Sequence, residues 1–94
     1  MRTVEWSDPA IADLEEIDDY WSAYSPDAAD RIAALIEEAA EFVAATPAAG
    51  PAIPEVDARK WRVAPTDYLL LYRVSDTHIE VLRIRHAREN WIRT

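Results

Sequence analysis

The side chains best suited to chemistry gather near the end of the chain. Arg83 and Arg85 are two residues apart in an alternating run, and His86 and Arg88 follow within three residues. The unperturbed pKa of histidine lies near neutrality, so its ring can transfer a proton, and arginine supplies a fixed positive charge that binds carboxylates or phosphates. This cluster suits either proton transfer beside a charge clamp or the binding of an acidic partner.

Each of these residues also has a purely structural interpretation. His86 can serve packing and hydrogen bonding at a strand end, and the arginines can pair with the surplus carboxylates of the same molecule. Trp61 and Trp91 are better suited to packing in the core and against the tail than to stacking on bases. We retain His86 as the single candidate for catalysis. The residues that we expect to contact a target or a partner protein are Arg59, Arg62, Arg73, Arg83, Arg85, His86, Arg88 and Trp91.

The formal net charge of -8 comes from 18 acidic and 10 basic residues that are unevenly distributed. Residues 1–50 hold 12 acidic and 2 basic residues, so the basic residues lie almost wholly in the second half. This asymmetry indicates two faces with different partners, and a solvated acidic helix face explains it equally well. A strongly acidic first half also disfavours direct binding to nucleic acid.

Composition limits the remaining classes of site. Cysteine is absent and the two histidines are well separated, so disulfides and thiolate chemistry are excluded, and we expect neither a metal site nor a cofactor. With 94 residues, half of them apolar, the chain can bury one modest core, and we expect a single domain over residues 1–94. No run approaches the ~18 to 20 apolar residues of a membrane span, and the N-terminus lacks the apolar centre of a signal peptide. We therefore expect a cytoplasmic protein without membrane contact.

The first half of the chain predicts a strand and two helices. An alternating run over residues 2–6 predicts a short strand, and a Ser-Asp-Pro sequence then begins a helix over residues 8–24. A second Ser-Pro-Asp signal begins another helix from Pro26, which ends before Pro47. Because their connection is short, we expect the two helices to form an antiparallel hairpin. The acidic residues expected on the solvent face of the first helix are Asp13, Glu15, Glu16, Asp18 and Asp19.

The second half predicts a loop and then strands. Residues 47–54 are rich in Pro and Ala and contain the only Gly, which indicates a loop without regular structure. Runs of β-formers over residues 59–64, 67–75 and 78–85 predict an antiparallel meander. The fold class is therefore α+β, in which an α-helical hairpin packs on a small antiparallel sheet that the N-terminal strand joins at an edge or in the middle.

Alternation in the last strand predicts which side chains share a face. Counting by twos places Arg83 and Arg85 on the same face as Ile79 and Val81. We expect this to be the face that points away from the helical hairpin. An arginine-lined sheet face would result.

Taken in order, these residues resemble the RelE/ParE toxin superfamily, and most closely its ParE-like branch, often described as plasmid stabilisation proteins. The resemblance covers nearly the whole chain and implies the fold given above. The residues that carry it are Trp6-Ser7-Asp8-Pro9-Ala10, Asp13-Leu14-Glu15-Glu16-Ile17, Tyr20, Ser25-Pro26, Pro47, Gly50, Tyr72-Arg73-Val74 and Arg85-His86-Ala87-Arg88.

The resemblance implies two different activities within the superfamily. Members that cleave mRNA on the ribosome need a base, an acid and a charge clamp together on the open sheet face. At positions where that branch carries two arginines and a tyrosine, this chain has Leu69, Ala87 and Trp91. We therefore expect a ParE-like toxin that inhibits DNA gyrase by binding and is not itself an enzyme.

Two alternatives stay open. One is a RelE-like mRNA endonuclease that uses His86 and the arginines, and the other is a non-toxic protein of the same fold that only binds an antitoxin. In every case the resemblance implies a cognate antitoxin as partner, with a C-terminal segment lying along the hairpin and sheet. Self-association through the hairpin to a homodimer also stays open.

Overall fold

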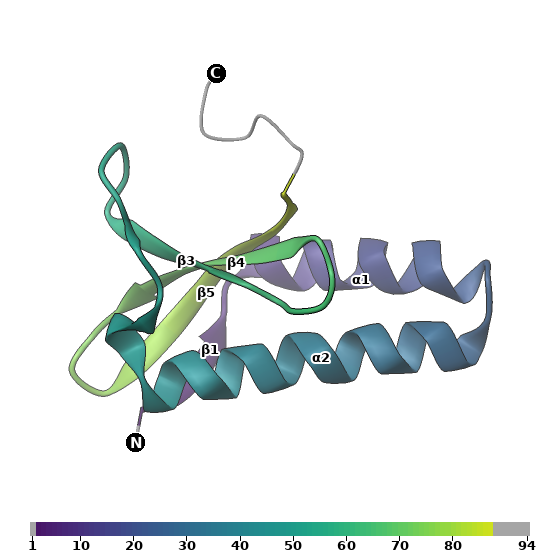
Figure 1. Cartoon of the computed structure of the whole chain (residues 1–94), viewed down its shortest axis with the longest axis horizontal. Coiled ribbons are helices and arrows are strands. Elements are labelled where there is room, and N and C mark those ends of the chain that lie inside the picture. The colour runs from purple at the N-terminus through teal and green to yellow at the C-terminus, as the bar shows by residue number, and fades with distance from the viewer. Residues whose placement is uncertain (1, 88–94) are drawn as a thin grey trace.

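The computed structural model describes residues 2–87 as one sheet with a helical hairpin packed against it (Figure 1). The elements in chain order are β1 (Thr3–Trp6), α1 (Asp8–Ser22), α2 (Pro26–Ala45), the 3-10 turn η1 (Pro47–Ala49), β2 (Ala52–Ile53), β3 (Ala58–Arg62), β4 (Tyr68–Val74) and β5 (His78–His86). The closed end of the hairpin extends past the sheet in this view.

Two serines determine where the helices begin. The Oγ atom of Ser7 accepts a hydrogen bond from the amide of Ala10 at 3.1 Å, and that of Ser25 accepts one from Ala28 at 3.0 Å. Both caps are followed by a proline in the first turn, where no amide hydrogen is needed. The predicted helices and their starting points are confirmed, although α1 ends at Ser22 because the next residues turn into α2.

The sheet has the strand order β1-β5-β4-β3-β2. The predicted antiparallel meander is confirmed for β3, β4 and β5, and the N-terminal strand lies at an edge, as one of the two expected positions. It pairs with β5 in parallel, so the sheet is mixed. A parallel pair needs a long crossover, which the hairpin and the intervening strands supply. The α+β class is thus confirmed.

The segment predicted as a loop without regular structure contains η1 and the short strand β2, so that prediction was wrong in part. The buried hydroxyl of Tyr72 explains the order of this segment, because it accepts a hydrogen bond from the Gly50 amide at 3.0 Å and donates one to the Pro47 carbonyl at 2.8 Å. A Cβ atom at Gly50 would collide with the Lys60 carbonyl oxygen and this hydroxyl. Glycine is required here by close approach.

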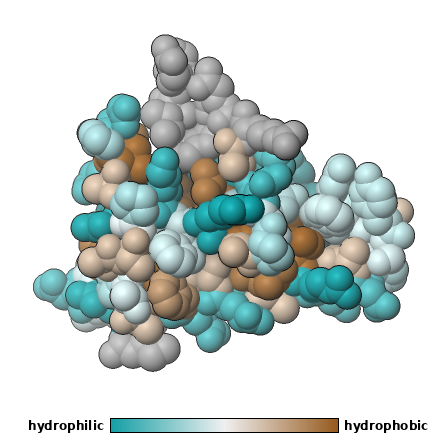
Figure 2. All heavy atoms as spheres, in the orientation of Figure 1, coloured by the Kyte–Doolittle hydropathy of each residue, from teal (hydrophilic) through white to brown (hydrophobic). Residues whose placement is uncertain are grey.

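The core lies between the hairpin and one face of the sheet. The largest fully buried side chains are Tyr72, Ile36, Leu70, Ile79, Val43, Val63 and Val81. On the face of the molecule shown in Figure 2, apolar residues form separate small groups between hydrophilic ones. Within residues 2–87, neither helix combines the length and apolar character that a membrane crossing requires.

A β-bulge changes which residues of β5 face the helices. Leu71 pairs with Arg83 but Tyr72 pairs with Val81, so Leu82 is an extra residue in β5. Ile79 and Val81 point into the core, whereas Arg83 and Arg85 lie opposite Leu71 and Leu69 on the open face. The prediction that Ile79 and Val81 share a face with the two arginines was wrong, because one inserted residue reverses the alternation.

Candidate functional site

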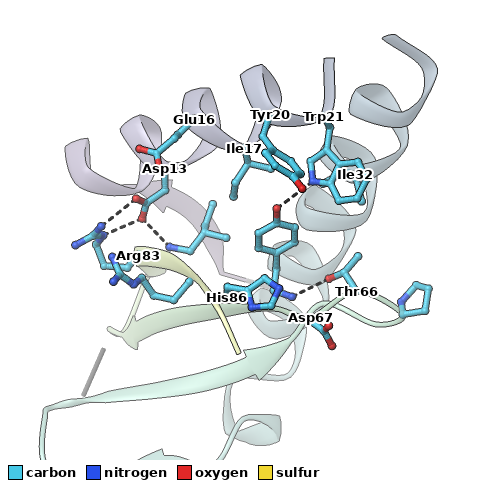
Figure 3. Close-up of a pocket in the computed structure, with 14 residues that line it drawn as sticks. Asp13, Glu16, Ile17, Tyr20, Trp21, Ile32, Thr66, Asp67, Arg83 and His86 are labelled. Carbon is cyan, nitrogen blue, oxygen red and sulfur yellow. Dashed lines mark hydrogen bonds and ion pairs between the residues drawn. The ribbon is translucent and has the colours of Figure 1, made fainter. Parts of the chain in front are cut away.

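A groove of about 830 Å³ runs between α1 and the ends of β4 and β5 (Figure 3). Its helical wall is formed by Ile17, Tyr20 and Trp21 of α1, and its opposite wall by Arg83, Arg85 and His86 of β5. The groove therefore joins an aromatic and apolar wall to a wall with cationic side chains.

Helical spacing places the α1 residues on one face, since positions three and four apart are neighbours on a helix. The indole Nε1 of Trp21 donates a hydrogen bond to the Tyr68 hydroxyl at 3.0 Å. The ring of Tyr68 in turn contacts His86 edge to face, with centroids 5.8 Å apart and planes at 81°. Tyr68 thus links α1 to the end of β5 across the groove.

Asp13 anchors the cationic wall to α1. Its two carboxylate oxygens accept hydrogen bonds from Nε and Nη2 of Arg83 at 2.8 and 3.0 Å, and Oδ2 also accepts one from the Ile84 amide at 2.9 Å. Such a two-point guanidinium pair fixes both side chains. The Asp13 side chain is 13% exposed and that of Arg83 is 40% exposed.

These contacts also set the protonation of Asp13. Burial alone would raise its pKa, but the Arg83 hydrogen bonds, the Ile84 amide and the charges of Arg83 and Arg85 outweigh burial and hold the pKa below its usual range. The carboxylate is therefore ionised at neutral pH, and the charge of Arg83 is balanced within the molecule.

The position of Asp13 follows from the shortness of β1. Its last residue, Trp6, pairs with Val81, so within the described chain the outer edge of β5 has no neighbouring strand beyond that point. The Ser7 amide donates to the Val81 carbonyl at 3.0 Å, the Ser7 hydroxyl donates to the Leu82 carbonyl at 2.8 Å, and Asp13 accepts from the next amide on this edge. The start of α1 thus supplies the hydrogen bonds that a strand would make.

The predicted contact residues are dispersed over the sheet. Of the predicted contact residues within residues 2–87, Arg83, Arg85 and His86 line the groove and the others do not. Arg59 donates from Nη1 to the Gly50 carbonyl at 2.7 Å, and Arg62 donates from Nε to the Thr66 carbonyl at 2.8 Å. Arg88 and Trp91 lie outside the described residues.

Several arginines pair with carboxylates of the same molecule. Arg62 lies 3.8 Å from Asp67, and Arg73 lies 3.8 Å from both Asp57 and Glu80. Arg62, Arg73 and Arg83 therefore each have a carboxylate partner within the molecule. Exposed pairs of this length contribute little to stability.

Trp61 packs in the way expected of a core residue. It is partly buried, packs against the core cluster and stacks on Phe42, with ring centroids 5.0 Å apart. No group of three or more metal-ligating side chains exists within residues 2–87.

Sequence reasoning missed Asp13, Tyr68 and the α1 aromatics as members of the site. The prediction that Asp13 shares the solvent face of α1 with the other acidic residues was wrong, because it points to β5. A signal was available: Asp13 is four residues before Ile17 and seven before Tyr20, so helical spacing puts it on the groove face.

Comparison with known proteins places the chain among bacterial toxins. The family model described as the ParE toxin of the type II toxin-antitoxin system parDE matches residues 4–91. Toxin RelE2 of Caulobacter vibrioides is 38% identical over 87 residues, covering 93% of this chain and 97% of that protein. The putative toxin Y4kP of Sinorhizobium fredii is 32% identical over 90 residues, covering 96% and 93%.

A solved structure gives the same result for the fold. The chromosomal ParDE toxin-antitoxin system of P. aeruginosa contains a chain with a TM-score of 0.77 and 25% identity, covering 94% of this chain and 98% of that one. The strand, the helical hairpin and the sheet found here are thus shared along almost the full length of both chains. With the family model spanning residues 4–91, this chain belongs to the ParE toxin family of type II toxin-antitoxin systems.

Proposed function

We propose that this ParE-family toxin acts by binding and inhibiting DNA gyrase in the cytoplasm, and that a cognate antitoxin neutralises it by binding. Membership of the family supports the toxin and its antitoxin partner. The observation that favours binding over cleavage is the pairing of Leu69 with Arg85. Leu69 directly follows Tyr68, where the mRNA-cleaving branch carries an arginine, so an apolar side chain stands beside Arg85 on the open face.

The groups that a nuclease would need are only partly available in the groove. Arg83, Arg85 and His86 all line it, but the charge of Arg83 is balanced by Asp13 within the molecule. Leu69 also stands where the mRNA-cleaving branch carries an arginine, which reduces the positive charge available to hold a phosphate. Cleavage of a phosphodiester needs a charge clamp and a proton-transfer group together, so this arrangement favours binding over cleavage.

The direct test is supercoiling of relaxed plasmid by purified gyrase. The purified chain should inhibit supercoiling or cause cleaved DNA to accumulate, and pre-incubation with the antitoxin encoded beside it should restore activity. The Val56→Ala variant, which changes an exposed side chain away from the groove, should inhibit equally. Full supercoiling at a large molar excess of the chain would contradict the proposal.

A second candidate function is ribosome-dependent mRNA cleavage. His86 lines the groove together with Arg83 and Arg85, and one relative bears the name RelE2. The test is primer-extension mapping of a translated mRNA with and without the toxin. Cleavage that disappears in His86→Ala would support this function, whereas the absence of translation-dependent cleavage would exclude it.

A further inference from the structure

Three aromatic side chains stand together at the closed end of the helical hairpin. Tyr20 and Tyr24 are 55% and 70% exposed, their ring centroids are 5.6 Å apart and their hydroxyl oxygens are 3.4 Å apart. The Trp21 ring lies 5.4 Å from Tyr20 and 5.7 Å from Tyr24 between centroids. We name Tyr20, Trp21 and Tyr24 the aromatic tip.

The aromatic tip is held in place by the fold, although its outer rings are exposed. Trp21 is fixed through its hydrogen bond to the Tyr68 hydroxyl, and the close-up shows Tyr20 next to this pair (Figure 3). The tip belongs to the end of α1 and the turn into α2, where Trp21 is partly buried against Tyr68 of β4 while Tyr20 and Tyr24 stay more than half exposed. Another exposed aromatic residue, Phe42, differs because it stacks on Trp61.

Exposed but ordered aromatic rings are typical anchors of protein interfaces. Tyrosine and tryptophan are enriched among the residues that dominate binding energy, since they bury a large area and lose little conformational freedom. The contacts among the three rings reduce that loss further. The aromatic tip thus has the features of an anchor whose partner lies outside the described chain.

The charge around the aromatic tip indicates the chemistry of this partner. Arg31 is the only basic residue in the whole segment 8–45, which is otherwise rich in carboxylates. The exposed acidic residues nearest in sequence to the tip are Glu15, Glu16, Asp18, Asp19, Asp27 and Asp30. A surface of this sign repels nucleic acid and attracts a basic protein surface.

We propose that the aromatic tip and the carboxylates around it form the surface by which the toxin docks onto its protein target, and that the target presents a basic surface at this contact. The inference rests on the proposed function, in which the toxin acts by binding a protein. If the target is gyrase, the surface of gyrase that the tip contacts is positively charged, like a surface that binds the phosphates of DNA. The tip then competes with DNA for that surface, and because Tyr20 and Trp21 also form part of the groove wall, the docked target covers this end of the groove.

The test compares four double variants after induced expression in a bacterial host without antitoxin. Tyr20→Ala with Tyr24→Ala removes the anchor, and Ile11→Ala with Val56→Ala removes two comparably exposed apolar side chains elsewhere. Asp18→Asn with Asp19→Asn neutralises the tip, and Glu37→Gln with Glu38→Gln makes the same charge change further along α2. Trp21 is left unchanged because it bonds to Tyr68.

We expect growth inhibition to fall about tenfold or more in the anchor variant and several-fold in the Asp18/Asp19 variant, with both controls near wild type. All four variants should bind the antitoxin as the wild type does, which also shows that they are folded. Any of four results would overturn the inference. These are wild-type toxicity in the anchor variant, equal effects in the tip and control variants, loss of antitoxin binding in the tip variants, and a wild type that is harmless.

The gyrase assay on the wild type is read separately. If the wild type leaves gyrase active while toxicity still depends on the aromatic tip, the gyrase proposal fails and the docking surface stands for another protein target. If gyrase is inhibited equally by the wild type and the anchor variant, the docking surface fails and the gyrase proposal stands. The Asp18/Asp19 variant changes only exposed side chains, so it keeps the test decisive if the anchor variant does not fold.

Discussion

Asp13 on α1 binds both Nε and Nη2 of Arg83 on β5, a residue 70 positions later in the chain, and it also accepts the amide hydrogen of Ile84. This relationship joins the helical hairpin to the part of β5 that β1 does not reach. It also gives the groove one charged wall of defined position. The first two predictions concern this pair.

Replacing Asp13 with asparagine should destabilise the protein by about 1–2 kcal/mol. The amide oxygen of the substituted side chain can still accept the Ile84 hydrogen, but the charge that balances Arg83 is lost, and the 40% exposure of Arg83 keeps the cost moderate. Urea unfolding measures the change. Asp18→Asn, an exposed position on the same helix, should remain within about 0.5 kcal/mol of wild type, and an equal loss in both variants would contradict the prediction.

The same pair predicts how stability depends on pH. The folded-state pKa of Asp13 is lowered from its ordinary value of 3.8, so the unfolded chain binds the proton more readily and stability rises with pH. The contribution of Asp13 to stability is complete above the pKa of the unfolded state, and it is lost as the pH falls through the lower pKa of the folded state. Unfolding midpoints measured from neutral pH down to the acid range should fall more steeply for wild type than for Asp13→Asn. Parallel curves for the two proteins would show that other groups control the loss of stability at low pH.

The two helix-capping serines should differ in their contribution to stability. Ser25→Ala removes a cap alone and should cost about 1 kcal/mol, whereas Ser7→Ala also removes the hydrogen bond to the Leu82 carbonyl on the open edge of β5. We expect the Ser7 variant to lose about 1 kcal/mol more than the Ser25 variant. Thermal or urea unfolding of the matched pair decides this, and equal losses would mean that water replaces the edge contact at no cost.

Removing the Tyr72 hydroxyl should loosen the segment from η1 to β2. Tyr72→Phe leaves the Gly50 amide and the Pro47 carbonyl without this partner at a fully buried position, at a cost of about 1–3 kcal/mol. Amide hydrogen exchange at Gly50 should become faster, while exchange in the α2 core changes less. Tyr24→Phe removes a hydroxyl from an exposed ring and serves as the control with little effect on stability. Unchanged exchange at Gly50 would contradict this account of the loop.

Much of the fold follows from signals that act within a few residues. Serine caps, early prolines and three- to four-residue apolar spacing determined both helices, and runs of β-formers between turn residues determined β3, β4 and β5. The ordered motifs were also enough to indicate the ParE-like toxins, a prediction that the family model confirmed. These features depend on local conformational preference, which the sequence carries directly.

Other features depend on which distant segments meet, so only the tertiary structure decided them. The direction of β1 and the extra residue Leu82 arise from the pairing of strands, and one inserted residue was enough to put Ile79 and Val81 on the face opposite to Arg83 and Arg85. Helical spacing could place Asp13 on the face of Ile17 and Tyr20, but only the position of β5 shows which residue it pairs with. Its ion pair spans 70 residues, and no local pattern determines such a contact, because its energy exists only when the two elements are packed together.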